Sequence, residues 1–342
     1  RPEFDLSESL DERVRFWFDI YSKYDSKNYV IHNRKKPWII YVVVNTDDLF
    51  ARRKPTWMNR MAADKRAEVK RKFYIKKTRL PNEEVRIQLG QRDFFADGLE
   101  KSSRLLPLME EVFMAEGLPA ELARIPLVES SFNHKAESKV GAKGIWQIMP
   151  SIGRKFLVMN EKLDERKSPL KSTRVAAYLL EENKMLLGNW PLAVTAYNHG
   201  TGGMRKAKKQ TNSSDLGVII KKYKSASFQF ASSNFYSCFL AALHAEKYKD
   251  FLFPEVELGR PADLTKLKLK FGKSAYALSK DLKINFEDLI EHNPDLHVKG
   301  HPKSLFLPKG FALFIPESHE VPREKIKAYS LDSAIGSAAS VK

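Results

Sequence analysis

Cysteine is almost absent from this chain of 342 residues, because Cys238 is the only one. A disulfide within the chain and a metal site built on cysteines are therefore excluded. Long apolar runs are missing as well, and no window approaches the roughly 18 consecutive apolar residues that a membrane span needs. The longest apolar run, from Trp38 to Val44, is instead typical of a buried strand.

Several signatures of cofactor and metal chemistry are also missing. The chain has no phosphate-binding Gly-Lys-Ser/Thr loop, no Rossmann fingerprint and no repeat of fixed period. Its histidines lack the spacing of metal ligands, and His297 and His301 flank Gly300 in a predicted loop. We therefore expect no metal and no cofactor.

Positive charge is present in excess, with 59 Lys and Arg against 42 Asp and Glu and a net charge of +17. Residues 1–82 hold about half of that excess, with 20 basic against 11 acidic residues. Such a charge favours a polyanionic partner, and nucleic acid, an anionic cell-wall polymer and an acidic membrane surface all fit it. Charge alone does not choose among them.

The patterning predicts a mainly α protein with small α+β modules at both ends. Residues 1–82 read as an α+β accessory region, in which a helix is followed by β-rich segments and a charged helix over 57–75. Residues 83–250 read as an all-helical domain, and Glu83 to Ala96 continues a helical pattern. Residues 254–320 predict strand, helix, helix and strand, and we expect residues 321–342 to be a flexible tail.

Within the helical domain, one helix is expected over Leu105–Ala115 and ends at Gly117, a typical C-cap residue. Pro119 is expected in the first turn of the next helix, which runs to about Ser130. The further helices expected from the apolar pattern are 173–187, 192–197 and 235–247.

Three short motifs with chemical potential follow in order: Glu129-Ser130-Ser131-Phe132, then Gly144-Ile145-Trp146-Gln147-Ile148-Met149-Pro150, then Ala196-Tyr197-Asn198-His199-Gly200. Glu129 follows four apolar residues, 125–128. A carboxylic acid held against apolar groups has a raised pKa and can stay protonated near neutral pH. We therefore interpret Glu129 as a candidate general acid.

The other two motifs supply neutral ligands. Trp146 offers a ring that can stack on a sugar, and Gln147, Tyr197 and Asn198 offer hydrogen-bonding groups suited to hydroxyl and acetamido substituents. Each motif taken alone is more often a packing or turn element than a site. Their joint order and spacing favour a glycan-binding site.

The three motifs together resemble the family-1 lytic transglycosylase domain, which is similar in fold to goose-type lysozyme. The resemblance covers about residues 86–250, and residues 163–179 resemble a segment found in membrane-bound members. It implies that Glu129 is the single acid and base that cleaves peptidoglycan between N-acetylmuramic acid and N-acetylglucosamine and leaves 1,6-anhydro ends. It also implies a sugar cleft lined by Ser130, Gly144, Trp146, Gln147, Tyr197 and Asn198.

One departure from the family concerns a tyrosine of the last catalytic helix. The alignment places Phe235 at that position, with Tyr236 one residue further on. Two alternatives stay open: Tyr236 takes the role and is a substrate-binding residue, or one hydroxyl of the site is missing.

Residues 264–316 resemble a divergent LysM module, a peptidoglycan-binding fold, although the usual Gly-Asp-Thr opening is absent. Glycan binding and a purely structural role both remain open for this module.

The leading hypothesis is a peptidoglycan lytic transglycosylase of the periplasm or cell envelope. A hydrolytic goose-type muramidase and a non-catalytic wall-binding protein are the alternatives. The expected partners are peptidoglycan glycan strands and no nucleic acid, whereas protein partners and outer-membrane association stay open. The chain starts at Arg1, so the sequence leaves open both a secreted and a lipid-anchored form.

Overall fold

The structure is a computed structural model that describes residues 3–4, 6–51, 55–298, 301–316 and 323–331. The chain forms two compact units. Unit 1 comprises Arg1–Leu99 and Leu180–Val256, and unit 2 comprises Glu100–Leu179 and Glu257–Lys342. Helices dominate and the sheets are small, which confirms the predicted mainly α fold class.

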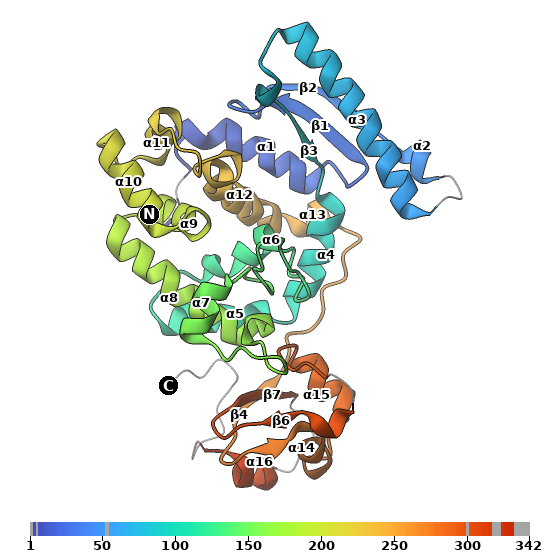
Figure 1. Cartoon of the computed structure of the whole chain (residues 1–342), viewed down its shortest axis with the longest axis vertical. Helices are drawn as coiled ribbons and strands as arrows, with labels where there is room; N and C mark the ends of the chain where they lie inside the picture. Colours follow the sequence, from blue (N-terminus) through green and yellow to red (C-terminus); the bar gives the residue numbers. More distant parts are fainter. Residues whose placement is uncertain (1–2, 5, 52–54, 299–300, 317–322, 332–342) are drawn as a thin grey trace. The chain divides into compact units, whose positions relative to one another are not determined.

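Unit 1 contains an antiparallel sheet of three strands in the order β2-β1-β3, with bounds Asn28–Asn33 for β1, Ile40–Asn45 for β2 and Val85–Leu89 for β3. The long helix α3 (Thr56–Thr78) packs along this sheet (Figure 1). The small residues Ala63 and Ala67 of α3 share a buried core with sheet residues, so the helix backbone can come close to the strands.

The helix predicted over Glu83–Ala96 is wrong. Residues 85–89 form β3 and pair with β1, from Tyr29 opposite Leu89 to Asn33 opposite Val85. Helix α4 begins only at Arg92 and runs to Ser103. The N-terminal sheet therefore includes residues beyond 82, where the sequence had placed the start of the helical domain.

The rest of unit 1 is helical. Helix α1 (Asp11–Ser22) is tied to α12 (Phe230–Lys247), because the Arg13 guanidinium and the Trp17 indole both donate to Asn234 Oδ1, at 2.8 and 3.0 Å. The other helices with residues in this unit are α2 (Asp47–Phe50), the later part of α8 (Pro169–Leu187), α9 (Trp190–His199), α10 (Thr201–Thr211), α11 (Leu216–Lys222) and α13 (Lys249–Leu252). The helices expected over 173–187, 192–197 and 235–247 correspond to α8, α9 and α12.

Unit 2 begins with the segment that carries the first two motifs. Its elements are α5 (Leu106–Ala115), a 3-10 helix (Ala120–Arg124), α6 (Ile125–Glu129), α7 (Pro150–Phe156) and a second 3-10 helix (Glu165–Lys167). As predicted, α5 ends ahead of Gly117, which has a φ of +69°. The helix expected after Pro119 is divided into a 3-10 and an α part, and Pro119 itself caps it.

The C-terminal part of unit 2 has the expected order of strand, helix, helix and strand. Strands β4 (Leu264–Lys268) and β7 (Ala312–Pro316) pair antiparallel. The remaining elements are β5 (Lys273–Ser274), α14 (Ala275–Asp281), α15 (Phe286–His292), a 3-10 helix (Pro302–Ser304) and β6 (Phe306–Leu307). The buried side chains of these elements form one apolar core.

A further helix, α16 (Arg323–Tyr329), follows these strands (Figure 1). Ile326 is buried in the same apolar core, and the Leu331 amide donates to the Lys268 carbonyl at 2.8 Å. The expectation of a flexible tail is therefore wrong over α16, because an apolar side chain anchors it. Residues 332–342 of that expected tail lie outside the described residues.

The two parts of unit 2 share a buried ionic contact. Lys171 Nζ lies 2.6 Å from Asp295 Oδ2 and 2.9 Å from Glu165 Oε1, and all three side chains are buried. Leu163 also belongs to the core of the C-terminal strands and helices. The segment of the first two motifs is thus packed against the C-terminal module, and the four-part domain division stays a prediction.

Over the part of the chain that the structure describes, no helix combines the length and the apolar content that crossing a bilayer requires.

Candidate active site

Glu129 is the last residue of α6 and is half-buried. Burial raises the pKa of its carboxyl from 4.5 to about 8. No hydrogen bond or ion pair to this carboxyl is formed by the described residues. The neutral acid is therefore favoured at pH 7, because the desolvated carboxylate lacks a compensating positive charge.

The backbone turns sharply after Glu129. Ser131 and Phe132 both adopt the left-handed conformation, with φ of +49° and +54°, which is costly for side chains larger than glycine. The amides of Ser130 and Phe132 both donate to the Pro126 carbonyl, at 3.1 and 3.2 Å, and the Phe132 ring is buried. These contacts hold a strained turn beside the candidate acid, as is common at functional sites.

The first and second motifs meet through Ser130, whose hydroxyl donates to the Ile145 carbonyl at 2.9 Å. Gly144 follows a tight path with a φ of +75°, and its amide donates to the Ala136 carbonyl at 3.0 Å. A Cβ at Gly144 would lie 2.1 Å from the Arg166 carbonyl oxygen, so only glycine fits. Gly144 therefore shapes the loop and offers no side chain to a ligand.

Gln147 also faces its own loop. Its φ is +49°, and its Nε2 donates to the Gly144 carbonyl at 2.9 Å and to the Ala136 carbonyl at 3.4 Å. The side chain is half-buried. Its amide nitrogen thus stabilises the loop, and contact of this residue with a sugar stays a prediction.

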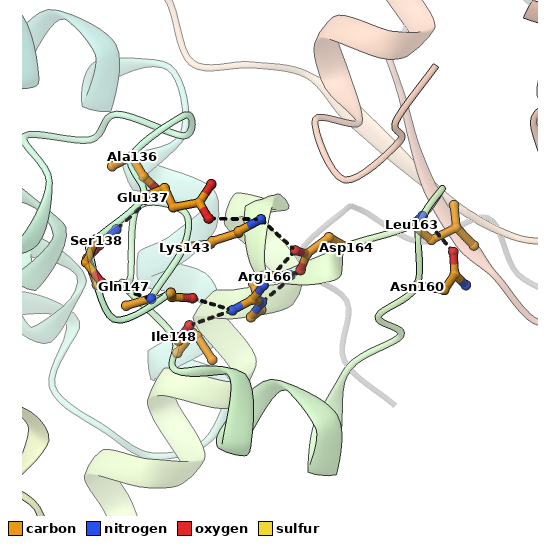
Figure 2. Close-up of polar contacts among 12 residues, drawn as sticks. Ala136, Glu137, Ser138, Lys143, Gln147, Ile148, Asn160, Leu163, Asp164 and Arg166 are labelled. Atoms are coloured by element: carbon orange, nitrogen blue, oxygen red, sulfur yellow. Dashed lines mark hydrogen bonds and ion pairs between the residues drawn. The ribbon is translucent and has the colours of Figure 1, made fainter. Parts of the chain in front are cut away.

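The loop of the second motif is clamped by Arg166, a buried residue (Figure 2). Its guanidinium donates to the Gly141 carbonyl at 2.8 Å and to the Ile148 carbonyl at 3.4 Å, at the two ends of the loop. Asp164 accepts two further bonds from Arg166, at 2.9 and 2.8 Å. Lys143 Nζ lies 3.8 Å from the same carboxylate. In the sequence, Arg166 and Asp164 belong to the segment 163–179 that resembles the family, and no motif signals their role in this clamp.

Trp146 is not accessible for stacking on a sugar, so the sequence expectation is corrected. Its side chain is fully buried, its indole donates to Thr173 Oγ1 at 2.8 Å, and its ring centre lies 5.8 Å from that of Phe113. The tryptophan therefore anchors the loop to the core of unit 2.

The third motif lies at the end of α9, in unit 1. Tyr197 is half-buried, and its ring is stacked on that of Phe235, with centres 6.5 Å apart and planes at 17°. Asn198 is exposed, and its Oδ1 accepts a bond from Ser232 Oγ at 2.9 Å. Both side chains are thus oriented by α12.

Tyr236 is not a cleft residue, so this candidate is wrong. It is only 1% exposed, and its ring centre lies 6.3 Å from that of Phe239. Successive residues of an α-helix point about 100° apart, and it is Phe235 that lies against Tyr197. Of the two alternatives from sequence, the structure favours the phenylalanine at the position beside the third motif.

The structure thus gathers Glu129, Ser130, Gly144, Trp146 and Gln147 in unit 2. It gathers Tyr197, Asn198 and Phe235 in unit 1. Proximity between these two sets stays a prediction. The described ranges contain no group of three or more His, Cys, Asp or Glu side chains placed to hold a metal ion.

The chain is similar in sequence to a known family and to individual known proteins. The model of the transglycosylase SLT domain matches residues 111–219, which include all three motifs. Membrane-bound lytic murein transglycosylase D of Escherichia coli K12 is 44% identical over 94 residues, which cover 27% of this chain and 21% of that protein. The "Putative tributyltin chloride resistance protein" of Alteromonas sp. strain M-1 is 34% identical over 153 residues, covering 37% of this chain and 74% of that protein.

Among solved structures, an inactive mutant of the lytic transglycosylase Slt from Pseudomonas aeruginosa matches with 24% identity and a TM-score of 0.34. The match covers 42% of this chain and 24% of that one. The chain belongs to the family of proteins with a transglycosylase SLT domain. It spans about a fifth of the length of the E. coli relative.

Proposed function

We propose that this chain is a peptidoglycan lytic transglycosylase. It cleaves the β-1,4 bond between N-acetylmuramic acid and N-acetylglucosamine, and Glu129 acts first as the acid and then as the base. The observation that carries the proposal is the half-buried carboxyl with a pKa of about 8, at the end of α6 inside an SLT domain.

In the first step, the protonated Glu129 gives its proton to the glycosidic oxygen, and the bond from that oxygen to C1 of the muramic acid breaks. The acetamido group of the same sugar stabilises the positive charge that develops at C1. The Glu129 carboxylate then takes the proton of the C6 hydroxyl, while the oxygen of that hydroxyl forms a bond to C1. The 1,6-anhydro ring closes and the acid is regenerated.

One carboxyl is enough for this reaction, because the nucleophile belongs to the substrate and the proton is given and recovered by the same group. Glycosidases that hydrolyse with two carboxyl groups need the second one as a nucleophile or to activate water. The raised pKa of Glu129 suits the first step, since the acid is still protonated at pH 7.

The remaining site residues divide into two roles. Ser130, Gln147, Tyr197 and Asn198 contact the glycan, whereas Gly144 and Trp146 hold the loop in place from inside the protein. Phe235 contributes a ring but no hydroxyl. We expect it to orient Tyr197 through the stacked contact between the two rings.

Mass spectrometry of the fragments released from purified peptidoglycan tests this proposal. A lytic transglycosylase releases anhydro-muropeptides, whereas a hydrolase releases products heavier by one water, about 18 Da. Products that are all hydrated would replace the proposal with a muramidase. Absence of released fragments at pH 7, with wall binding retained, would replace it with a non-catalytic binding protein.

We further propose that residues 264–316 form a LysM-like module that binds glycan strands, and that the protein works in the cell envelope. The pairing of β4 with β7 around α14 and α15 supports this assignment. Cosedimentation of the whole Glu129→Gln chain with insoluble peptidoglycan should show retention that soluble glycan fragments compete away. Retention that these fragments do not affect would contradict glycan binding.

A further inference from the structure

Helix α3 has an unusual distribution of apolar side chains. Its buried residues are the small or polar Asn59, Ala63 and Ala67. The side facing away from the sheet carries exposed large side chains with lysines between them. We name this surface the outer α3 face: Trp57, Met58, Met61, Lys65, Val69, Lys72, Phe73 and Lys76.

These residues lie on one side of the helix. At 100° per residue, all eight fall within about 160° of the helix circumference, and the buried residues fall on the opposite side. The exposed fractions of Trp57, Met61 and Phe73 are 64%, 64% and 56%. Single exposed apolar side chains are common on protein surfaces, whereas a cluster of large ones on one side of a helix marks an interaction site.

The charge of α3 indicates the kind of partner. Its 23 residues contain eight Lys or Arg and two Asp or Glu. Arg66 is committed to a two-bond contact with Asp48, and Arg71 to one with Glu68.

The lysines of the outer α3 face are placed differently. Lys65, Lys72 and Lys76 are exposed, and no described residue forms an ion pair with them. They stand among the apolar side chains rather than on a separate side of the helix. A partner of this face must therefore accept positive charge and apolar groups side by side.

We propose that the outer α3 face binds the surface of an anionic phospholipid bilayer. A helix lying in the plane of the interface can place Trp57, Met61 and Phe73 among the upper acyl chains. The flexible lysine side chains can then extend to the phosphate groups. A glycan polymer would offer negative charge without an apolar layer, so the bilayer matches both features of the face.

Flotation of the full chain with lipid vesicles tests the proposal. Vesicles of phosphatidylcholine alone are compared with vesicles that also contain about 30% phosphatidylglycerol, a composition with a negative surface potential. The wild-type chain should float with the anionic vesicles and much less with the neutral ones. Tryptophan emission should shift to the blue on binding, and Trp57→Phe should remove most of that shift.

Two variants separate the contributions. Lys65→Gln/Lys72→Gln/Lys76→Gln should lower binding by about 5-fold per lysine, or about 100-fold in all. Met61→Ser/Phe73→Ser should lower it at least about 10-fold, because two apolar side chains no longer enter the bilayer. The control Met185→Ser/Phe251→Ser, whose wild-type side chains are 71% and 85% exposed on other helices, should bind within about 2-fold of wild type.

The proposal is overturned if the wild-type chain does not float with anionic vesicles, the result expected if the face is covered by a protein instead. It is also overturned if the control variant loses as much binding as the two α3 variants. Thermal unfolding confirms that each variant is folded. All variants should cleave short soluble glycans at the wild-type rate. A failure of the membrane proposal can therefore be told apart from a failure of the proposed enzymatic function.

Discussion

Two motif regions of this protein use their residues in opposite ways. In unit 2, the loop of the second motif holds Trp146 fully buried, and the Gln147 amide nitrogen bonds to loop carbonyls. In unit 1, the end of α9 leaves Asn198 exposed and Tyr197 half-buried. We propose that the first region mainly frames the site and that the second presents side chains to the glycan, although both are equally recognisable in sequence.

The glycines of the two regions show the same difference. Gly144 and Gly200 both have positive φ, at +75° and +90°. A Cβ at Gly144 would collide with the Arg166 carbonyl oxygen, whereas a Cβ at Gly200 would meet nothing within 4 Å. Packing therefore requires glycine in the frame, and only backbone conformation favours it at the end of α9.

The largest predicted effect concerns Glu129, which adjoins the frame and which we propose as the acid and base. Glu129→Gln keeps the size of the side chain and removes the proton that cleavage needs. Peptidoglycan turnover should fall by about 10³-fold, within the range typical of lost general acid–base catalysis. Release of soluble muropeptides measures this, and turnover within a few-fold of wild type would exclude Glu129 as the acid.

Alanine substitutions at Gly144 and Gly200 compare the two regions through the free energy of unfolding. Gly144→Ala should lower the free energy of unfolding by more than about 3 kcal/mol, because strain from φ adds to a backbone collision. Gly200→Ala should cost about 1–3 kcal/mol, from backbone conformation alone, because a φ of +90° with a ψ of +140° suits only glycine. Urea denaturation of both variants measures the difference. Equal costs would mean that the loop around Gly144 relaxes freely and is not a rigid frame.

Arg166 tests whether the frame serves catalysis. Arg166→Lys keeps a positive charge near Asp164 but loses the bonds to the loop carbonyls, at a cost of about 1–3 kcal/mol in stability. As a positioning residue, it should lower kcat by about 10-fold while KM changes less. Steady-state kinetics on a soluble glycan separates the two constants. A change in stability with kcat unaltered would show that the clamp is purely structural.

The smallest effect on stability is expected at Asn198. Asn198→Ala removes one partly buried hydrogen bond, which Ser232 donates, and should cost about 1 kcal/mol. Its effect on KM should nonetheless exceed that of Ser232→Ala if, as we propose, the amide contacts the glycan directly and the serine only orients it. Equal kinetic effects of the two variants would mean that Asn198 only supports the local structure and does not contact the glycan.

The sequence predicted the elements that depend on local pattern. The end of α5 ahead of Gly117, the order of elements over 264–316 and the raised pKa of Glu129 all follow from neighbouring residues. It missed β3, because the pairing partner of Val85–Leu89 lies in β1, more than 50 residues earlier. A strand stabilised by distant residues leaves a weak local signal.

The errors within the site have a similar cause. Residue type alone does not show that the Trp146 ring points into the core or that Phe235 rather than Tyr236 lies against Tyr197. Both depend on the orientation of a loop or helix relative to its neighbours. The clamp by Arg166 was missed because it acts on backbone carbonyls, which any loop sequence provides.

The central claim is that the Glu129 carboxyl is neutral at pH 7. A ¹³C NMR titration of the glutamate side-chain carboxyl carbons, in wild type and in Glu129→Gln, measures this directly. We predict one carboxyl with a midpoint at about pH 8 in the wild-type protein, absent from the variant. The Glu129 signal titrating at pH 4 to 5, about where ordinary glutamates do, would contradict the account.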